Sequence, residues 1–142
     1  MMGFHFLGET SMNQAAMQDS GKLVLRVVLG VLILLHGVAK LKGGLAPIEG
    51  MLAANGLPTV LAYGAWIGEV LAPLLLVLGF YARLAAAIIA INMLFAVGLA
   101  HMGQLWQLNE QGGWALELQA MFLFAAVAIV LLGPGRHGVN QR

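Results

Sequence analysis

Long apolar runs dominate this chain, and short polar stretches separate them. Four runs, near residues 23–41, 60–79, 84–102 and 114–132, are each close to the roughly 20 residues that an α-helix needs to cross a bilayer core. This pattern predicts an all-α integral membrane protein, folded as a four-helix bundle. Residues 1–20 lack the basic start and apolar core of a signal peptide, so we expect a loosely ordered extension there.

The first loop between the apolar runs carries the signals of a short helix. Pro47 suits the first turn of a helix, whereas Asn55 and Gly56 suit a left-handed stop. Apolar residues fall on one side of this segment, which predicts a short amphipathic helix lying on the mouth of the bundle and partly covering it. A plain solvated loop is the alternative. The apolar residues are Ile48, Met51 and Leu52.

The amino-acid composition excludes several classes of function. Of the 142 residues 61% are hydrophobic and 9% are charged, which is typical of a membrane protein. The chain has no cysteine, so it cannot itself supply a thiolate nucleophile, a disulfide or an iron–sulfur cluster, and a redox role requires a borrowed electron carrier. With a net charge of +1 and scattered basic residues, nucleic acid is not an expected partner.

The flanking charges predict an orientation. Basic residues are enriched in the cytoplasmic loops of membrane proteins. Five of them fall on one side of the predicted spans and two, Lys40 and Lys42, fall on the other, so both termini are expected in the cytoplasm. The five are Lys22, Arg26, Arg83, Arg136 and Arg142.

Ionisable residues within the spans are the candidate site, because an unpaired charge in hydrocarbon costs several kcal/mol. At about 100° per residue, Arg26, His36 and Lys40 share an arc of roughly 80° on the first span, together with Gly30, Ile33 and Gly37. This face is expected to point inward. Glu69 lies near the middle of the second span, where it must pair or be protonated.

The rise of about 1.5 Å per residue places further polar groups in the outer half of the membrane. His36 and Lys40 lie in the outer half, His101 ends the third span, and Glu117 lies one turn into the fourth. We therefore predict a cavity that opens away from the cytosol, with Glu69 as its floor. The candidate catalytic residues are Glu69, Lys40, His36 and Glu117; the candidate ligand-binding residues are Lys40, His36, His101 and Trp66; no metal ligands are predicted.

Some of the candidate site residues also have purely structural interpretations. Lys40 and Glu69 could form an ion pair that only fixes helix register, and Arg26 is expected to be structural. His36 could move a proton, bind haem iron with His101, or simply bond a backbone carbonyl.

Two further features concern packing. Asn92 precedes His101 by nine residues, which predicts opposite faces and a role in helix packing. A small-residue seam, Gly64, Gly68 and Ala72, lets another helix approach the second span, and association of copies of the chain stays open.

Several short motifs, in order, resemble the DoxX family over about residues 20–138. They are Arg26 with Gly30, residues 37–40 (GVAK), 56–58 (GLP), Glu69, 78–83 (LGFYAR) and 133–135 (GPG). The resemblance implies a four-span bacterial inner-membrane protein over residues 21–138, related to the small membrane subunit of thiosulfate:quinone oxidoreductase. Family members often carry an acidic residue in the tail where this chain has Asn140, so a role of that carboxylate is not expected here. Residues 139–142 are expected to form a C-terminal tail.

Three functions follow from these observations. The first is a subunit or accessory of a quinone-linked oxidoreductase system, in which Lys40 and His36 hydrogen-bond a quinone and Glu69 or Glu117 relays its proton. The second is a non-catalytic membrane anchor or assembly partner for a soluble redox or detoxifying enzyme. A small solute transporter is the least favoured, because Pro73 is the main hint of a broken helix.

Overall fold

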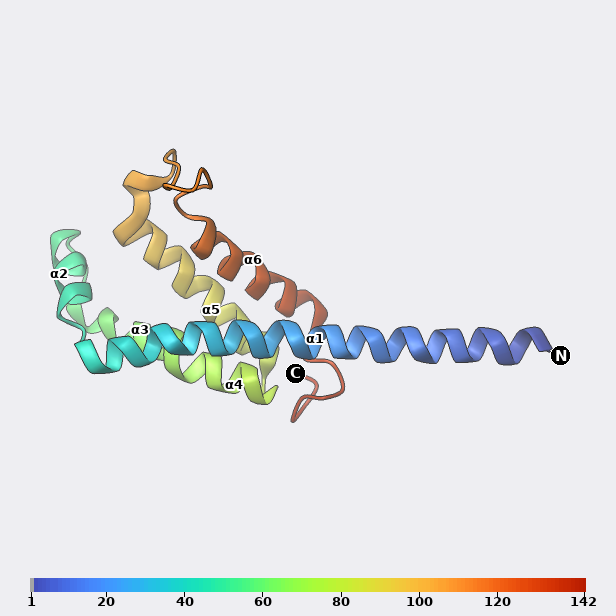
Figure 1. The fold of residues 1–142 in the computed structure, drawn as a ribbon. Coiled ribbons are helices and arrows are strands. Elements are labelled where there is room, and N and C mark those ends of the chain that lie inside the picture. Colours follow the sequence, from blue (N-terminus) through green and yellow to red (C-terminus); the bar gives the residue numbers. More distant parts are fainter. Residues whose placement is uncertain (1) are drawn as a thin grey trace.

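The structure, a computed structural model, describes the backbone of residues 2–142 and the side chains of residues 12–142. It is built from helices (Figure 1), and these helices differ in their winding. The α-helices are α1 (Met2–Gly43), α2 (Ala46–Ala54), α3 (Gly64–Trp66), α4 (Ala72–Leu78), α5 (Ala82–Ala96) and α6 (Glu117–Leu132). The tighter 3₁₀ turns are η1 (Thr59–Tyr63) and η4 (Met102–Gln104), and the wider π-helical turns are η2 (Ile67–Leu71) and η3 (Val97–His101).

These elements form the expected all-α membrane bundle. Three helical stretches are long and apolar enough to cross a membrane: Met12–Gly43, Thr59–Leu78 and Ala82–Gln104. The shorter apolar helix α6 packs against α5 and α1, while α4 packs against α1 and α5, so four helical stretches share one core. Large apolar side chains remain exposed on the outer faces, as lipid-facing surfaces require. The short helix in the first loop is also confirmed as α2.

Helix α1 differs from the sequence-based expectation at its start. In place of the loosely ordered extension expected over residues 1–20, residues 2–20 form the first part of α1, and residue 1 lies outside the described residues. Figure 1 shows this part projecting beyond the other helices. Residues 12–18 are rich in Met, Gln and Ala and contain no proline, so they continue a helix that the first span has already started.

Two glycines let α1 approach the second span closely. A Cβ atom on Gly30 would lie 2.6 Å from Cγ2 of Val77 and 3.0 Å from the carbonyl oxygen of Pro73. On Gly37, it would collide with the backbone carbonyl of Glu69. These glycines lie two turns apart on one face of α1, so this face packs backbone against backbone.

Arg26 links α1 to the end of α4 and to the segment that follows α6. Its side chain is 1% exposed. The guanidinium donates to the carbonyls of Leu76 (3.1 Å) and Val77 (2.5 Å) at the end of α4, and to that of Pro134 (3.1 Å). The last carbonyls of a helix lack internal partners and carry partial negative charge, which suits a cation. The expected structural role of Arg26 is therefore confirmed.

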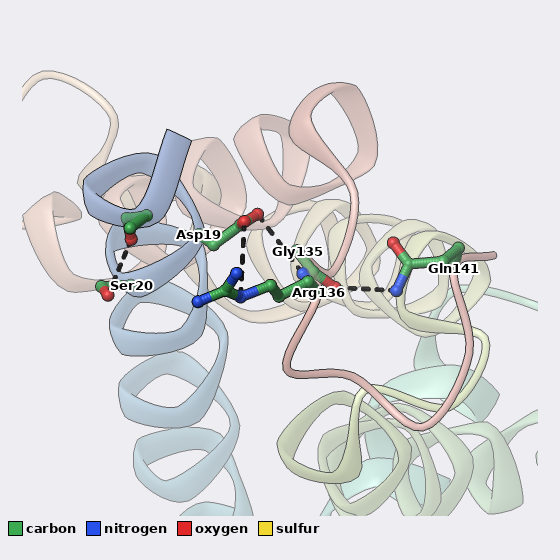
Figure 2. A network of polar contacts seen from close by, with 6 residues as sticks. Asp19, Ser20, Gly135, Arg136 and Gln141 are labelled. Atoms are coloured by element: carbon green, nitrogen blue, oxygen red, sulfur yellow. Dashed lines mark hydrogen bonds and ion pairs between the residues drawn. The ribbon is translucent and has the colours of Figure 1, made fainter. Parts of the chain in front are cut away.

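The C-terminal tail packs back onto the bundle. The side-chain oxygen of Asn140 accepts a hydrogen bond from the backbone N–H of Tyr81 (3.0 Å), a residue with a left-handed φ of 50° at the start of α5. Figure 2 shows a second contact, in which the backbone N–H of Arg136 donates to Asp19 of α1 (3.3 Å). An uncharged Asn140 is thus enough to fix this turn.

Candidate functional site

An ion pair between Lys40 and Glu69 lies at the centre of the predicted site. The ammonium nitrogen of Lys40 lies 2.6 Å from each carboxylate oxygen of Glu69. The side chain of Glu69 is 7% exposed, whereas that of Lys40 is 32% exposed. Glu69 thus depends on Lys40 for its counter-charge, and Lys40 keeps access to its surroundings.

The helix carrying Glu69 is wound as a π-helix, and a proline accounts for this. In η2 the N–H of Ala72 donates to the carbonyl of Ile67, five residues earlier. Pro73 has no N–H to offer the carbonyl of Glu69, and a proline ring clashes with the carbonyl four residues before it. The wider turn relieves that clash, and Gly37 of α1 packs on the same carbonyl.

A second π-helical turn, η3, faces the same region and ends at His101. Such turns are rare and are frequently found at functional sites, because the inserted residue redirects side chains locally. In this chain, two of them bring Glu69 and His101 to the edges of the same cavities.

The larger cavity has a volume of about 460 Å³ and lies between the second span and α5, beneath α2. Pockets that bind small organic molecules are typically about 300–1,000 Å³ and mostly apolar, with a few polar groups. This cavity has that character: Ile88, Ile91 and Phe95 line it, while Lys40 and Glu69 supply the charges.

Helix α2 covers this cavity as predicted. The three apolar residues that the sequence placed on one side of α2, Ile48, Met51 and Leu52, all line the cavity. Leu52 is 2% exposed and packs in a small core with Leu45, Ala62 and Ala65. The segment between the first two spans therefore contains a helix that covers the cavity, and the alternative of a plain solvated loop is wrong.

A smaller hollow of about 120 Å³ lies between α1, α5 and α6. It shares four residues with the larger cavity: Lys40, Glu69, Ala96 and His101. His36 and Gln119 line the smaller hollow only. The ion pair thus borders two spaces of different character, one mainly apolar and one with several polar groups.

Glu117 does not belong to the site, and this part of the prediction is wrong. It is the first residue of α6, it is exposed, and it accepts a hydrogen bond from the side chain of Asn109 (3.1 Å). The expected depth assumed that the last helix begins at Trp114. Residues 105–116 instead form an irregular loop, so Glu117 lies at a helix N-terminus, where a carboxylate is stabilised.

The remaining candidates occupy different positions. His101 lines both cavities and pairs through Nδ1 with the side-chain oxygen of Gln104 (3.0 Å). His36 is exposed, and its ring makes a T-shaped contact with that of Phe122, with centroids 5.8 Å apart. Trp66 lines neither cavity; it packs against the core beneath α2 and against Tyr63.

The expected separation of Asn92 and His101 is wrong, because both line the larger cavity. The intervening η3 widens the helix by a π turn, so nine residues no longer amount to a half rotation. The packing role expected for Asn92 is supported, since a Cβ atom on Gly68 would lie 2.6 Å from the side-chain carbon Cγ of Asn92.

Gln119 was missed at the sequence level. It lines the smaller hollow, and its side-chain oxygen is buried with no hydrogen-bond donor among the described residues. The available signal was its position, because it is the only polar side chain in the apolar run from 118 to 132.

The site can donate and accept hydrogen bonds at the end of an apolar space. The Lys40 ammonium has three N–H donors, and the Glu69 carboxylate has lone pairs beyond those that it offers Lys40. Among the side chains of residues 12–142, no three His, Cys, Asp or Glu residues cluster as metal ligands do. The arrangement suits a ligand with a polar head and an apolar body.

Comparisons with known proteins agree with the fold. Residues 21–102 match the model of the DoxX family. A protein of Haemophilus influenzae, described as uncharacterized, is 31% identical over 121 residues, which cover 83% of this chain and 87% of that protein. No solved structure matches the chain.

Proposed function

Because this chain belongs to the DoxX family of proteins, we propose that it is a bacterial inner-membrane protein that binds a quinone and acts as a subunit or accessory of a quinone-linked oxidoreductase system. One observation carries the proposal: an apolar cavity of about 460 Å³ that ends on the partly buried Lys40–Glu69 ion pair.

The chemistry of a quinone fits this space. Its ring and isoprenoid tail are apolar, and Ile88, Ile91 and Phe95 would surround them. Its carbonyl oxygens accept hydrogen bonds, which Lys40 can donate, and the hydroxyl of the reduced form can donate to Glu69. The chain contains no cysteine to hold an iron–sulfur cluster, so the electrons would come from a partner protein.

The proposed orientation places this cavity away from the cytosol. Arg83 and the tail arginines, Arg136 and Arg142, lie at the end of the bundle opposite α2 and the cavity, and this basic end would face the cytoplasm. Both termini would then be cytoplasmic. The cavity would lie in the outer half of the bilayer.

Ligand binding tests the proposal. Gly64 lines the cavity, and a Cβ atom there would meet nothing within 4 Å, so Gly64→Leu should fill space without forcing the helices apart. Gly98 has equally free space but lines neither cavity, which makes Gly98→Leu the matched control.

We expect purified protein to carry co-extracted quinone and to bind added quinone. Binding should fall about tenfold or more in Gly64→Leu and in Glu69→Gln, and should stay unchanged in Gly98→Leu. Equal binding by Gly64→Leu and the unsubstituted protein would refute the assignment of the cavity.

A second function, a non-catalytic anchor for a soluble enzyme, is favoured by one feature of the α5–α6 loop. Trp106 is 96% exposed and Leu108 is 72% exposed. Exposed aromatic side chains of this kind often contribute strongly to protein interfaces. If anchoring is the function, Trp106→Ala should release a defined redox or detoxifying enzyme from native membranes while quinone binding stays unchanged.

A further inference from the structure

The Lys40–Glu69 pair borders a second space, whose lining differs from that of the ligand cavity. The smaller hollow, of about 120 Å³, presents the imidazole of His36 and the amide of Gln119 beside the two charges. A third polar side chain, that of His101, lies at the boundary between the two spaces.

Gln119 indicates what fills this hollow. Its side-chain oxygen is buried, and no donor from the described residues reaches it. A buried acceptor without a partner costs about 1–3 kcal/mol, and in proteins such groups are usually satisfied by ordered water. A hollow of this size with several polar groups has room for more than one water molecule.

The larger cavity borders lipid instead. Ile67, Ile91 and Phe95 line it, and these side chains are 48%, 54% and 55% exposed. They belong to helical stretches that are apolar enough to cross the membrane, so their exposed surfaces face acyl chains. A lipid-soluble ligand would reach the ion pair from this side.

We propose that the smaller hollow, lined by α1, α5 and α6, is a water-filled inlet through which protons reach the Lys40–Glu69 pair. Once electrons from a partner protein have reduced the bound quinone, the Lys40 ammonium gives a proton to an oxygen of the reduced quinone: its N–H bond breaks and an O–H bond forms. The resulting neutral amine then takes its replacement proton from a hydronium ion in the hollow, which leaves a water molecule behind. The ligand step rests on the proposed function, whereas the hydration of the hollow does not.

The charges around the pair are consistent with this route. Lys40 and His36 face the hollow from α1, Glu69 faces it from η2, and His101 faces it from η3. Helix α6 contributes only the uncharged Gln119 to the polar lining, because Glu117 is bonded to Asn109 in the loop. His36 is an exposed residue of α1, and its imidazole lies on the lining of the hollow beside Lys40.

Cysteine labelling tests the hydration directly, since the native chain has no cysteine to obscure the signal. A thiol reacts with aminoethyl methanethiosulfonate as the thiolate, which requires water. In vesicles, His36→Cys and Gln119→Cys should react about tenfold or more faster than Phe124→Cys, whose α6 side chain is 66% exposed but lines neither cavity. Equal rates at the three positions would overturn the proposal.

A second experiment identifies the route while leaving the ion pair intact. Ala96 lines both spaces, so a cysteine there lies where they meet. Adding Gln119→Phe, which fills the hollow, should slow the labelling of Ala96→Cys about tenfold, and adding Gly64→Leu should not. The reverse result would show that water enters through the larger cavity and would refute the inlet.

Quinone binding separates this inference from the proposed function. Gln119→Phe should block labelling at position 96 and leave quinone binding unchanged, because it fills only the hollow. Protein that shows the predicted labelling but binds no quinone would retain the inlet and refute the ligand. Protein that binds quinone but lacks the labelling difference would refute the inlet alone.

Discussion

Removing Lys40 should destabilise the protein more than removing Glu69, although the two residues form one ion pair. The side chain of Glu69 is 7% exposed, so the variant Lys40→Met leaves a buried carboxylate without a counter-charge. Breaking a buried pair in this way costs about 3–5 kcal/mol, and we expect about 3 kcal/mol because Lys40 is partly exposed.

Replacing Glu69 should destabilise the protein less than replacing Lys40. Glu69→Gln keeps a side-chain oxygen that can accept a hydrogen bond from Lys40, and Lys40 is 32% exposed, so its charge can be solvated. We expect a cost of about 1 kcal/mol. In the double variant no buried charge is left, so its cost should be about 2 kcal/mol less than the sum of the two single costs.

The assay is reversible unfolding of the purified protein in mixed micelles, followed by loss of helical circular dichroism. Lys42→Met is the matched control, because Lys42 is exposed, lies two residues away and forms no ion pair with the residues described. Equal small losses in both single variants, with an additive double variant, would refute a buried and coupled pair.

Three further substitutions, one beside the site and two at the other end of the bundle, test individual packing contacts by the same unfolding assay. Gly37→Ala should cost about 1–3 kcal/mol, because its methyl group collides with the Glu69 carbonyl, whereas Gly98→Ala should be neutral or slightly stabilising; equal effects would contradict the close contact. Arg26→Lys should cost about 2 kcal/mol through loss of one or more bonds to carbonyls, and an unchanged stability would show that these bonds contribute little. Asn140→Ala should cost about 1 kcal/mol by leaving the Tyr81 N–H without its acceptor, while Asn140→Asp should retain it; equal losses would contradict this cap.

The sequence was sufficient for the features that depend on composition and local spacing. Apolar runs of membrane-spanning length predicted the bundle, and Pro47 with Asn55–Gly56 predicted helix α2. The Lys40–Glu69 pair was one alternative at the sequence level, because a carboxylate at mid-membrane depth must pair or be protonated, and the structure shows that pair. His36 was expected on the inward face, but it is exposed while it lines the smaller hollow.

Features that depend on helix winding and on exact helix ends were not predictable in this way. The π turn η3 brings Asn92 and His101 to one cavity, and no proline or other sequence signal marks it. Glu117 was placed too deep because the apolar pattern begins before the helix does. Gln119, in place of Glu117, is the polar group that α6 contributes to the smaller hollow.

Photo-crosslinking with an azidoquinone, followed by mapping of the labelled residues, tests the central claim most directly. If the quinone occupies the cavity above the Lys40–Glu69 pair, label should concentrate on Ile91 and Phe95 of α5 and should be lost in Gly64→Leu. Label spread evenly over lipid-facing positions such as Met121 and Phe124 of α6, and unchanged by Gly64→Leu, would contradict it.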